Sequence, residues 1–148
     1  MQVSAEVACG GDGGLSVEER KVIRRAHNVR RKKLAEGKET AHDGLKMKAA
    51  SNILQMKYDC ELENYAQNWI NKCKFDHSPQ AEREGKGENI YYYGTTGDLK
   101  DRSHYLRDAA KSWWNEVKNI TNVTVGDKGL ELTQAMAMDG ALHWSQVD

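Results

Sequence analysis

Two histidines and two glutamates are the side chains best suited to chemistry in this sequence, and they are widely separated: His77, Glu88, Glu116 and His143. Imidazole nitrogens and carboxylate oxygens can bind a borderline cation such as Zn2+, and the same groups can serve as general acid and general base. Their spacing does not show that they meet. Taken singly, a histidine in a loop is more often a surface residue than a ligand, and a glutamate near a helix end is usually solvated.

The sequence contains no local catalytic motif. His-Glu-x-x-His, the Walker loop, Gly-x-Ser-x-Gly and Cys-x-x-Cys are all absent. Gly85-Lys86-Gly87 is interpreted as a turn, because no helix N-terminus follows to make it a phosphate cradle. His27 borders the apolar stripe of a predicted helix, so it is expected to be a core residue. A site must therefore be assembled from separate elements.

Two helices are predicted in the first half of the chain. Ser16 and Glu19 form a capping box, and helical apolar spacing then continues until Gly37 offers a C-cap. A second helix is capped by Asp59 and ends near Cys73. Its apolar stripe consists of Leu62, Tyr65, Ala66, Trp69 and Ile70. Residues 38–55 form a polar connection with a short helical turn over 49–54. These assignments place His77 in a loop after the second helix.

The second half is predicted to mix strand and helix. Residues 88–93 are β-branched and aromatic and are closed by Gly94, which indicates a strand. A third helix, capped by Ser103, carries Trp113 and ends near Asn119. Residues 130–138 are expected to form a short helix, and 141–147 the beginning of a strand. Trp69, Trp113 and Tyr65 are expected on buried stripes.

Composition limits the classes of protein that fit. A chain of 148 residues corresponds to one domain, with residues 1–14 a flexible, glycine-rich lead-in and 15–148 the folded unit. Lys and Arg total 22, as do Asp and Glu, so no net field favours nucleic acid or an anionic membrane. No run approaches the ~20 apolar residues that a membrane span needs. A basic run on the first helix is interpreted as a solvated face rather than a nucleic-acid or lipid-headgroup patch, because no aromatic residues interleave it: Arg24, Arg25, Arg30, Arg31, Lys32 and Lys33.

The cysteines and two N-glycosylation sequons indicate whether the protein is secreted or cytosolic. The chain has three cysteines, Cys9, Cys60 and Cys73, and an odd number cannot all form disulfides with one another. A helix rises about 1.5 Å per residue, which separates Cys60 from Cys73 by about 20 Å and prevents a bond between them. Three reduced cytosolic thiols are the alternative. Tandem N-glycosylation sequons at Asn119 and Asn122 favour secretion, and residues 1–8 contain no intact signal peptide, which is absent or already removed.

Six short motifs follow one another along the chain: His27-Asn28-x-x-Arg31, Met56-Lys-Tyr58-Asp-Cys-Glu-Leu62, Phe75-x-His77-Ser78, Gly87-Glu88-Asn89-Ile90, Trp113-Trp114-x-Glu116 and His143-Trp144-Ser145-Gln146. In this order they resemble the CAP superfamily, which comprises cysteine-rich secretory, antigen 5 and pathogenesis-related class 1 proteins. The sequence around Cys60 and Cys73 is most similar to nematode venom-allergen-like or activation-associated secreted proteins.

The resemblance implies an α+β fold, a three-layer α-β-α sandwich with a small antiparallel sheet, in a secreted, disulfide-bonded protein. It also implies that the two histidines and two glutamates converge in a cleft, where His77 and His143 can hold a divalent cation, usually zinc. Leu142 stands where the family has Gly, and the final motif stops at Asp148. We therefore expect a C-terminally truncated domain whose last strands are missing, and in which the partners of Cys60 and Cys73 include residues outside the chain.

Three functions are compatible with these residues. The first is a non-enzymatic secreted protein that binds a sterol or fatty acid, or a host or receptor protein, in host interaction or immune modulation. The alternative is a zinc-dependent hydrolase, with zinc on the histidines and Glu88 or Glu116 as general base. In the third, the four residues are a structural polar cluster, and replacing Glu116 lowers stability without changing binding.

Overall fold

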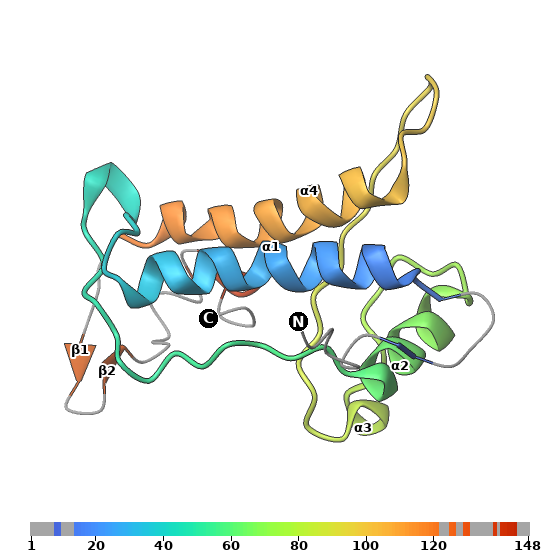
Figure 1. Ribbon diagram of the computed structural model, residues 1–148, viewed down its shortest axis with the longest axis horizontal. Helices are drawn as coiled ribbons and strands as arrows, with labels where there is room; N and C mark the ends of the chain where they lie inside the picture. The colour runs from blue at the N-terminus through green and yellow to red at the C-terminus, as the bar shows by residue number, and fades with distance from the viewer. Residues whose placement is uncertain are drawn as a thin grey trace, which may run out of the picture.

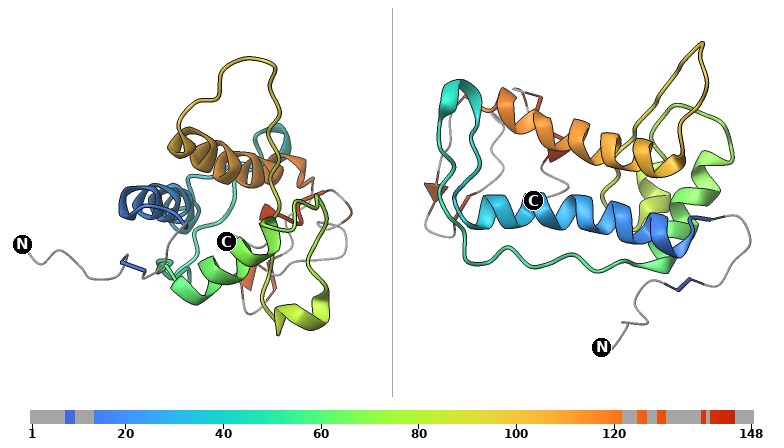
Figure 2. Two further views of the ribbon diagram at one scale, coloured as in Figure 1. Left: turned by 90° about the vertical axis from the view of Figure 1, so that its right-hand side faces the viewer. Right: turned by 45° about the horizontal axis from the view of Figure 1, so that its top comes forward.

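The fold is organised around two long helices that lie side by side. The computed structural model describes residues 8–9, 14–121, 125–126, 129–130, 138 and 140–144. Helices α1 (Val17–Ala35) and α4 (Arg102–Asn115) pack together and run in the same direction (Figure 1). The 3-10 helix η2 (Glu116–Asn119) continues α4 and contacts η1 (His42–Gly44). Helices α2 (Cys60–Ile70) and α3 (Gln80–Arg83) lie near the end where α1 begins (Figure 2).

The helix starts follow from short-range hydrogen bonds. The predicted capping box is confirmed: Ser16 Oγ accepts from the Glu19 backbone N–H at 3.2 Å, and the Glu19 carboxylate accepts from the Ser16 N–H at 2.7 Å. Asp59 caps α2 as predicted. The cap of α4 is Asp101 rather than Ser103, because the Asp101 carboxylate reaches the His104 N–H and starts the helix earlier.

The predicted three-layer α-β-α sandwich is wrong for the described residues, which are mostly helical and form no sheet between helix layers. Their strands are β1 (Val125–Gly126) and β2 (Gly129–Leu130), a short antiparallel pair with Val125 opposite Leu130. Residues 88–93, the expected strand, are outside any strand. The indole N–H of Trp113 donates to the Ile90 carbonyl at 3.1 Å, so a side chain bonds a group that a neighbouring strand would use.

Two other local predictions also differ from the structure. Residues 49–54 form no helical turn; this segment runs along α1 (Figure 1). Asn28 holds it by exchanging hydrogen bonds with the backbone of Met56 at 2.8 and 2.9 Å, and Arg31 donates to the Leu54 carbonyl. Residues 141–144 turn instead of beginning a strand. The helix expected over 130–138 lies largely outside the described residues.

The core lies where α4 passes into η2. Trp114 and Trp144 meet edge to face with ring centroids 6.1 Å apart. Trp69, Trp113 and Tyr65, which we expected on buried stripes, are only half-buried. For Trp69 and Tyr65 the reason is that α2 has no buried residue, so its apolar face remains partly exposed. The buried cluster consists of Leu34, Ala41, Met47, Trp114, Val117, Ile120, Ala141 and Trp144.

A buried carboxylate stands beside this core. Glu39 is 2% exposed, and its carboxylate accepts from the Trp114 indole N–H at 2.7 Å and from Lys33 Nζ at 3.0 Å. Burial alone would raise the pKa of Glu39, but these hydrogen bonds and the bond from the Thr40 N–H outweigh it and hold the pKa below its ordinary value. The charge is therefore retained inside the fold.

A disulfide attaches the N-terminal segment to α2. Cys9 is bonded to Cys60 with their Cα atoms 5.5 Å apart, so the partner of Cys60 lies within the chain, a pairing that the sequence left open. Helix geometry excluded only the Cys60–Cys73 pairing, and nothing in the sequence placed Cys9 beside α2. Cys73 is a free, exposed thiol. Within the described ranges, no helix is long and apolar enough to cross a membrane.

Candidate functional site

His77 and Glu88 form the first of two His–Glu pairs. His77 Nδ1 lies 2.7 Å from Glu88 Oε1. An ionised carboxylate only accepts hydrogen bonds, so Nδ1 is the donor in this pair, and in the neutral imidazole the lone pair is on Nε2. Ser78, which is almost fully buried, adds its N–H to Glu88 Oε1 at 3.0 Å and its hydroxyl to Oε2 at 2.7 Å. The carboxylate is thereby fixed, while the imidazole remains half-exposed.

These hydrogen bonds also determine the charge of Glu88. Burial alone would raise its pKa, but the bonds from Ser78 and His77 outweigh burial and hold the pKa of this carboxyl below its ordinary value. Glu88 is therefore ionised at neutral pH and is a weak base, since a general base works best with a pKa near the working pH.

Glu116 and His143 form the second pair by the same arrangement. His143 Nδ1 donates to Glu116 Oε1 at 2.6 Å. Glu116 Oε2 accepts from the backbone N–H groups of His143 at 2.8 Å and Trp144 at 3.2 Å. Because Glu116 is the first residue of η2, the end of the long helix fixes the turn that carries His143.

Asn89 links the two pairs. Its side-chain N–H donates to the His143 carbonyl at 2.9 Å, and Asn89 directly follows Glu88. Its Oδ1 is buried and has no hydrogen-bond partner in the described structure. Among the described residues, no three His, Cys, Asp or Glu side chains form a metal-binding group. The structure therefore shows two separate His–Glu pairs, which Asn89 connects through the His143 backbone.

The sequence analysis assigned no site role to Ser78 or Asn89. Both directly follow a candidate residue, and this adjacency is the signal that could have identified them. Asn119, the first glycosylation candidate, is exposed at the end of η2, and its side-chain N–H lies 3.4 Å from the Gly140 carbonyl. The second candidate, Asn122, lies outside the described residues.

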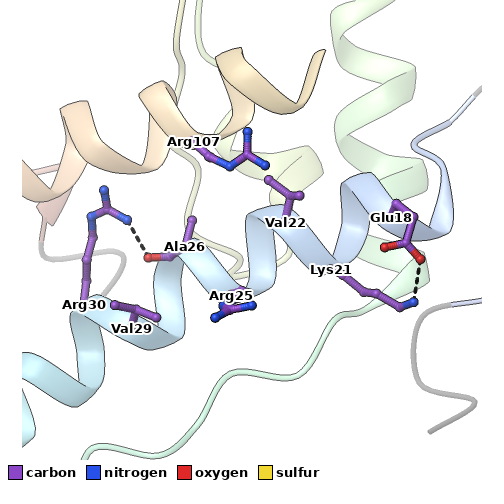
Figure 3. Close-up of a pocket in the computed structure, with 8 residues that line it drawn as sticks. All are labelled: Glu18, Lys21, Val22, Arg25, Ala26, Val29, Arg30 and Arg107. Atoms are coloured by element: carbon purple, nitrogen blue, oxygen red, sulfur yellow. Dashed lines mark hydrogen bonds and ion pairs between the residues drawn. The ribbon is translucent and has the colours of Figure 1, made fainter. Parts of the chain in front are cut away.

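Among the grooves that α1 lines, one lies on the side of α4 and another on the side of α2. The α1–α4 groove has a volume of about 490 Å3, and its lining is rich in arginine (Figure 3). The α1–α2 groove has a volume of about 510 Å3 and reaches the site, because Glu88 and Asn89 line it. Most of the lining surface of the α1–α2 groove is apolar, contributed chiefly by Leu15, Ile23, Met56, Leu62, Ala66 and Trp113.

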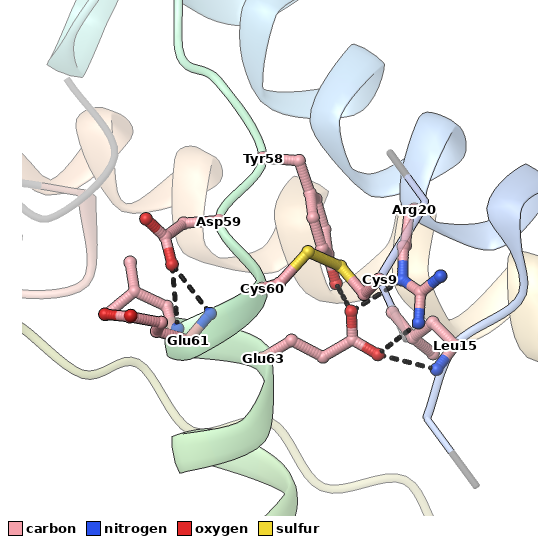
Figure 4. The surroundings of a disulfide bond; sticks show 9 residues. Cys9, Leu15, Arg20, Tyr58, Asp59, Cys60, Glu61 and Glu63 are labelled. Carbon is pink, nitrogen blue, oxygen red and sulfur yellow. Dashed lines mark hydrogen bonds and ion pairs between the residues drawn. A yellow bond between two sulfur atoms is a disulfide. The ribbon is translucent and has the colours of Figure 1, made fainter. Parts of the chain in front are cut away.

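A charged cluster beside the disulfide stiffens one wall of the α1–α2 groove (Figure 4). Arg20 Nε donates to Glu63 Oε2 at 2.6 Å, and the Tyr58 hydroxyl donates to the same oxygen at 2.9 Å. The hydrogen bonds from Arg20 lower the pKa of Glu63 to about 2, even though burial opposes this shift. Burial raises the pKa of Tyr58. The wall therefore keeps its shape and its charges at neutral pH.

His27 also lines this groove. Its Nδ1 lies 2.9 Å from the Ile23 carbonyl, and its ring centroid lies 6.2 Å from that of Trp113. Burial lowers the pKa of His27, and the charges of Arg30 and Arg31 lower it further, against the raising effect of the Ile23 bond. His27 is therefore hydrogen-bonded, but it is half-buried in the groove lining and lies outside the buried core in which we expected it.

Comparison with known proteins assigns the chain to a family. Residues 24–147 match the cysteine-rich secretory protein family, CAP, and the chain belongs to this family. It is 34% identical to BmVAL-1 over 94% of the chain, and the two structures superpose with a TM-score of 0.81. The crystal structure of NaASP2 with Zn2+ is 30% identical over 93% of the chain, with a TM-score of 0.76. The predicted similarity to nematode venom-allergen-like proteins is confirmed.

Curated relatives give the same assignment and show how much of each is matched. Ancylostoma secreted protein of Ancylostoma caninum is 37% identical over 76% of the chain, but the match spans 26% of that protein. Venom allergen 5 of Microctonus hyperodae is 29% identical over 90% of the chain and 55% of its own length. The match to BmVAL-1 covers 67% of that structure. The chain thus corresponds to part of each relative.

Proposed function

We propose that the chain is a secreted, non-enzymatic CAP protein that binds an apolar ligand, a sterol or fatty acid, in the α1–α2 groove. The observation that carries the proposal is the apolar lining of this groove, which includes Trp113 and borders on Asn89. A volume of about 510 Å3 is within the usual size range of small-molecule sites. The names of relatives, secreted protein and venom allergen, support secretion.

Polar groups at the groove give the ligand an orientation. Asn89 Oδ1 is a buried acceptor without a partner, so a ligand hydroxyl placed there would satisfy it. Lys57 lines the same groove and supplies a positive charge that a fatty-acid carboxylate would use instead. A sterol and a fatty acid would share the apolar contacts of the groove but differ in the head-group contact. Comparing their binding therefore shows whether Asn89 or Lys57 binds the head group.

The test is binding of a fluorescent sterol and a fluorescent fatty acid to the purified chain and two leucine variants. Leu62→Gln removes apolar surface from the groove, and we expect the dissociation constant to rise about tenfold, the effect of losing most of a buried leucine's transfer energy. Leu99→Gln is the control, because Leu99 is exposed in a loop and lines neither groove. No saturable binding of either probe removes the lipid proposal and leaves a host or receptor protein as the partner.

A second proposal is that the two imidazoles hold a divalent cation such as zinc. Each histidine presents Nδ1 to a carboxylate and leaves Nε2 available, the arrangement in which carboxylates orient metal-binding histidines. These donors are of the kind that zinc prefers, and in this proposal His77 and His143 would be the ligands and Glu88 and Glu116 their supports. A bound zinc ion would supply Lewis-acid polarisation and a more acidic bound water.

Hydrolysis is the less favoured use of such a cation. Both oxygens of Glu116 already accept hydrogen bonds, and the hydroxyl and N–H of Ser78 occupy Glu88 together with His77. A carboxylate held in this way is poorly placed to take a proton from water. Zinc titration by calorimetry tests the site, with His77→Ala/His143→Ala as the variant. Stoichiometric zinc retained by this double variant would contradict the proposal.

A further inference from the structure

The α1–α4 groove contains positive charge that the proposed function does not use. Four basic residues line it: Lys21, Arg25 and Arg30 from α1, and Arg107 from α4 (Figure 3). Its lining contains one acid, Glu18, which pairs with Lys21 at 2.6 Å. The chain as a whole has no net charge, so this groove concentrates positive charge locally.

The arginines of this groove differ from other basic residues nearby. Arg20, Lys33 and Arg102 are each paired with a glutamate. In the part of the chain that the structure describes, Arg25, Arg30 and Arg107 form no ion pair. Arg30 donates to the Ala26 carbonyl at 2.7 Å and Arg107 to the Ser103 carbonyl at 3.2 Å. A guanidinium has five N–H donors, so most of its donors are not used by these bonds.

The partial burial of Arg30 costs solvation free energy when no ligand is bound. Its guanidinium is partly buried, and burial lowers its pKa, against the raising effect of the Glu39 charge. A cation that leaves water without an ion-pair partner loses solvation free energy. An anion in the groove would offset this cost through charge-assisted hydrogen bonds, which guanidinium forms in bidentate fashion with phosphate- and sulfate-like oxygens.

The arrangement of the charges indicates a linear ligand. Lys21 and Arg25 are one helical turn apart, and Lys21 to Arg30 spans about 14 Å at 1.5 Å per residue. Arg107 adds a further positive charge to the lining from α4, and Lys111 follows one turn later on that helix. The lining contains no aromatic residue, either to stack nucleic-acid bases or to anchor the groove in a lipid surface. A flexible chain with repeated sulfate groups fits a basic groove between two helices.

We propose that the α1–α4 groove binds a linear sulfated polysaccharide through Arg25, Arg30 and Arg107. This site is separate from the α1–α2 groove and from the His–Glu pairs, so the proposal does not depend on lipid or zinc binding. It gives a chemical role to the basic face of the first helix, for which the sequence alone favoured simple solvation.

The experiment measures binding of a fluorescent heparin oligosaccharide to the whole chain. We expect saturable binding that weakens as salt is raised, because the contacts are ionic. Arg25→Gln/Arg107→Gln should raise the dissociation constant by at least about tenfold, since hydrogen bonds between charged groups are lost. Both arginines are exposed, so this variant should fold; its circular dichroism and unfolding midpoint verify this.

Lys48→Gln/Lys74→Gln is the matched control, with the same change in net charge at exposed positions outside the groove. It should change the dissociation constant by less than about twofold. Equal losses in both variants, absence of heparin binding, or equal affinity for an unsulfated polysaccharide would overturn the proposal. Tighter, arginine-dependent binding of single-stranded DNA or of phosphatidylserine vesicles would also overturn it, by assigning the groove to another class of partner.

Discussion

Asn89 donates its side-chain N–H to the backbone carbonyl of His143 at 2.9 Å, and this contact joins the two His–Glu pairs. Glu88 precedes Asn89 in the chain, so the first carboxylate and the second histidine are connected through adjacent backbone. The two His–Glu pairs are thus connected through Asn89, so we expect a substitution at Asn89 to affect both pairs.

Replacing Asn89 by alanine should weaken this link. We expect Asn89→Ala to lower the free energy of unfolding by about 1 kcal/mol, the net value of a typical hydrogen bond. Zinc affinity should fall as well, because the spacing of the two imidazoles is less well fixed. Chemical denaturation and calorimetric zinc titration measure the two effects. Asn64→Ala, at an exposed position on α2, should change neither.

Glu116→Gln distinguishes a metal site from a structural cluster. If His143 is a zinc ligand, loss of its supporting carboxylate should lower zinc affinity about tenfold or more. The loss of hydrogen bonds to the His143 and Trp144 backbone should also destabilise the fold by about 1 kcal/mol. Reduced stability with unchanged zinc affinity would support the structural interpretation. Asp98→Asn, in an exposed loop, is the control for the change in charge.

The Cys9–Cys60 bond should contribute strongly to stability. The two cysteines are separated by 51 residues in sequence, and cross-linking a loop of this length stabilises a fold by about 4 kcal/mol in the chain-entropy model. We expect Cys9→Ser/Cys60→Ser to lose an amount of this order in urea denaturation. Cys73→Ser removes an exposed free thiol and should leave the midpoint unchanged. Equal effects of the two variants would contradict the assigned pairing.

Glu63 should make the fold sensitive to acid. Its pKa in the folded state is about 2, below the ordinary value of 4.5. A lowered pKa means that the ionised carboxylate contributes its full stabilisation above pH 4.5 and loses it as the pH falls towards 2. Glu63→Gln should cost about 3 kcal/mol at pH 6, because Arg20 loses its buried partner.

The difference in unfolding free energy between the native chain and Glu63→Gln should therefore shrink as the pH falls from 5 towards about 2. Denaturation curves at several pH values measure this trend. Glu61→Gln, at an exposed position on the same helix, should show no such difference. A constant difference between the native chain and Glu63→Gln over the whole range would contradict the role given to the Arg20–Glu63 pair.

Local elements were largely predictable from the sequence. The Ser16 capping box, the Asp59 cap and the end of the third helix near Asn119 depend on residues within a few positions of each other, so their hydrogen bonds can be inferred from spacing. The prediction of a strand over residues 88–93 is wrong for the opposite reason. Strand formation depends on a partner elsewhere in the chain, and Trp113 supplies the bond to Ile90 instead.

For the site, the sequence by itself determined the residue types, and the resemblance of its motif blocks determined the family. Only the tertiary structure decided that His77 pairs with Glu88 and His143 with Glu116, that Asn89 links the pairs, and that Cys60 bonds Cys9. It also decided that Arg25 and Arg107, on different helices, line one groove. The physical reason is that these contacts join segments distant in sequence, and their geometry is set by how the helices pack.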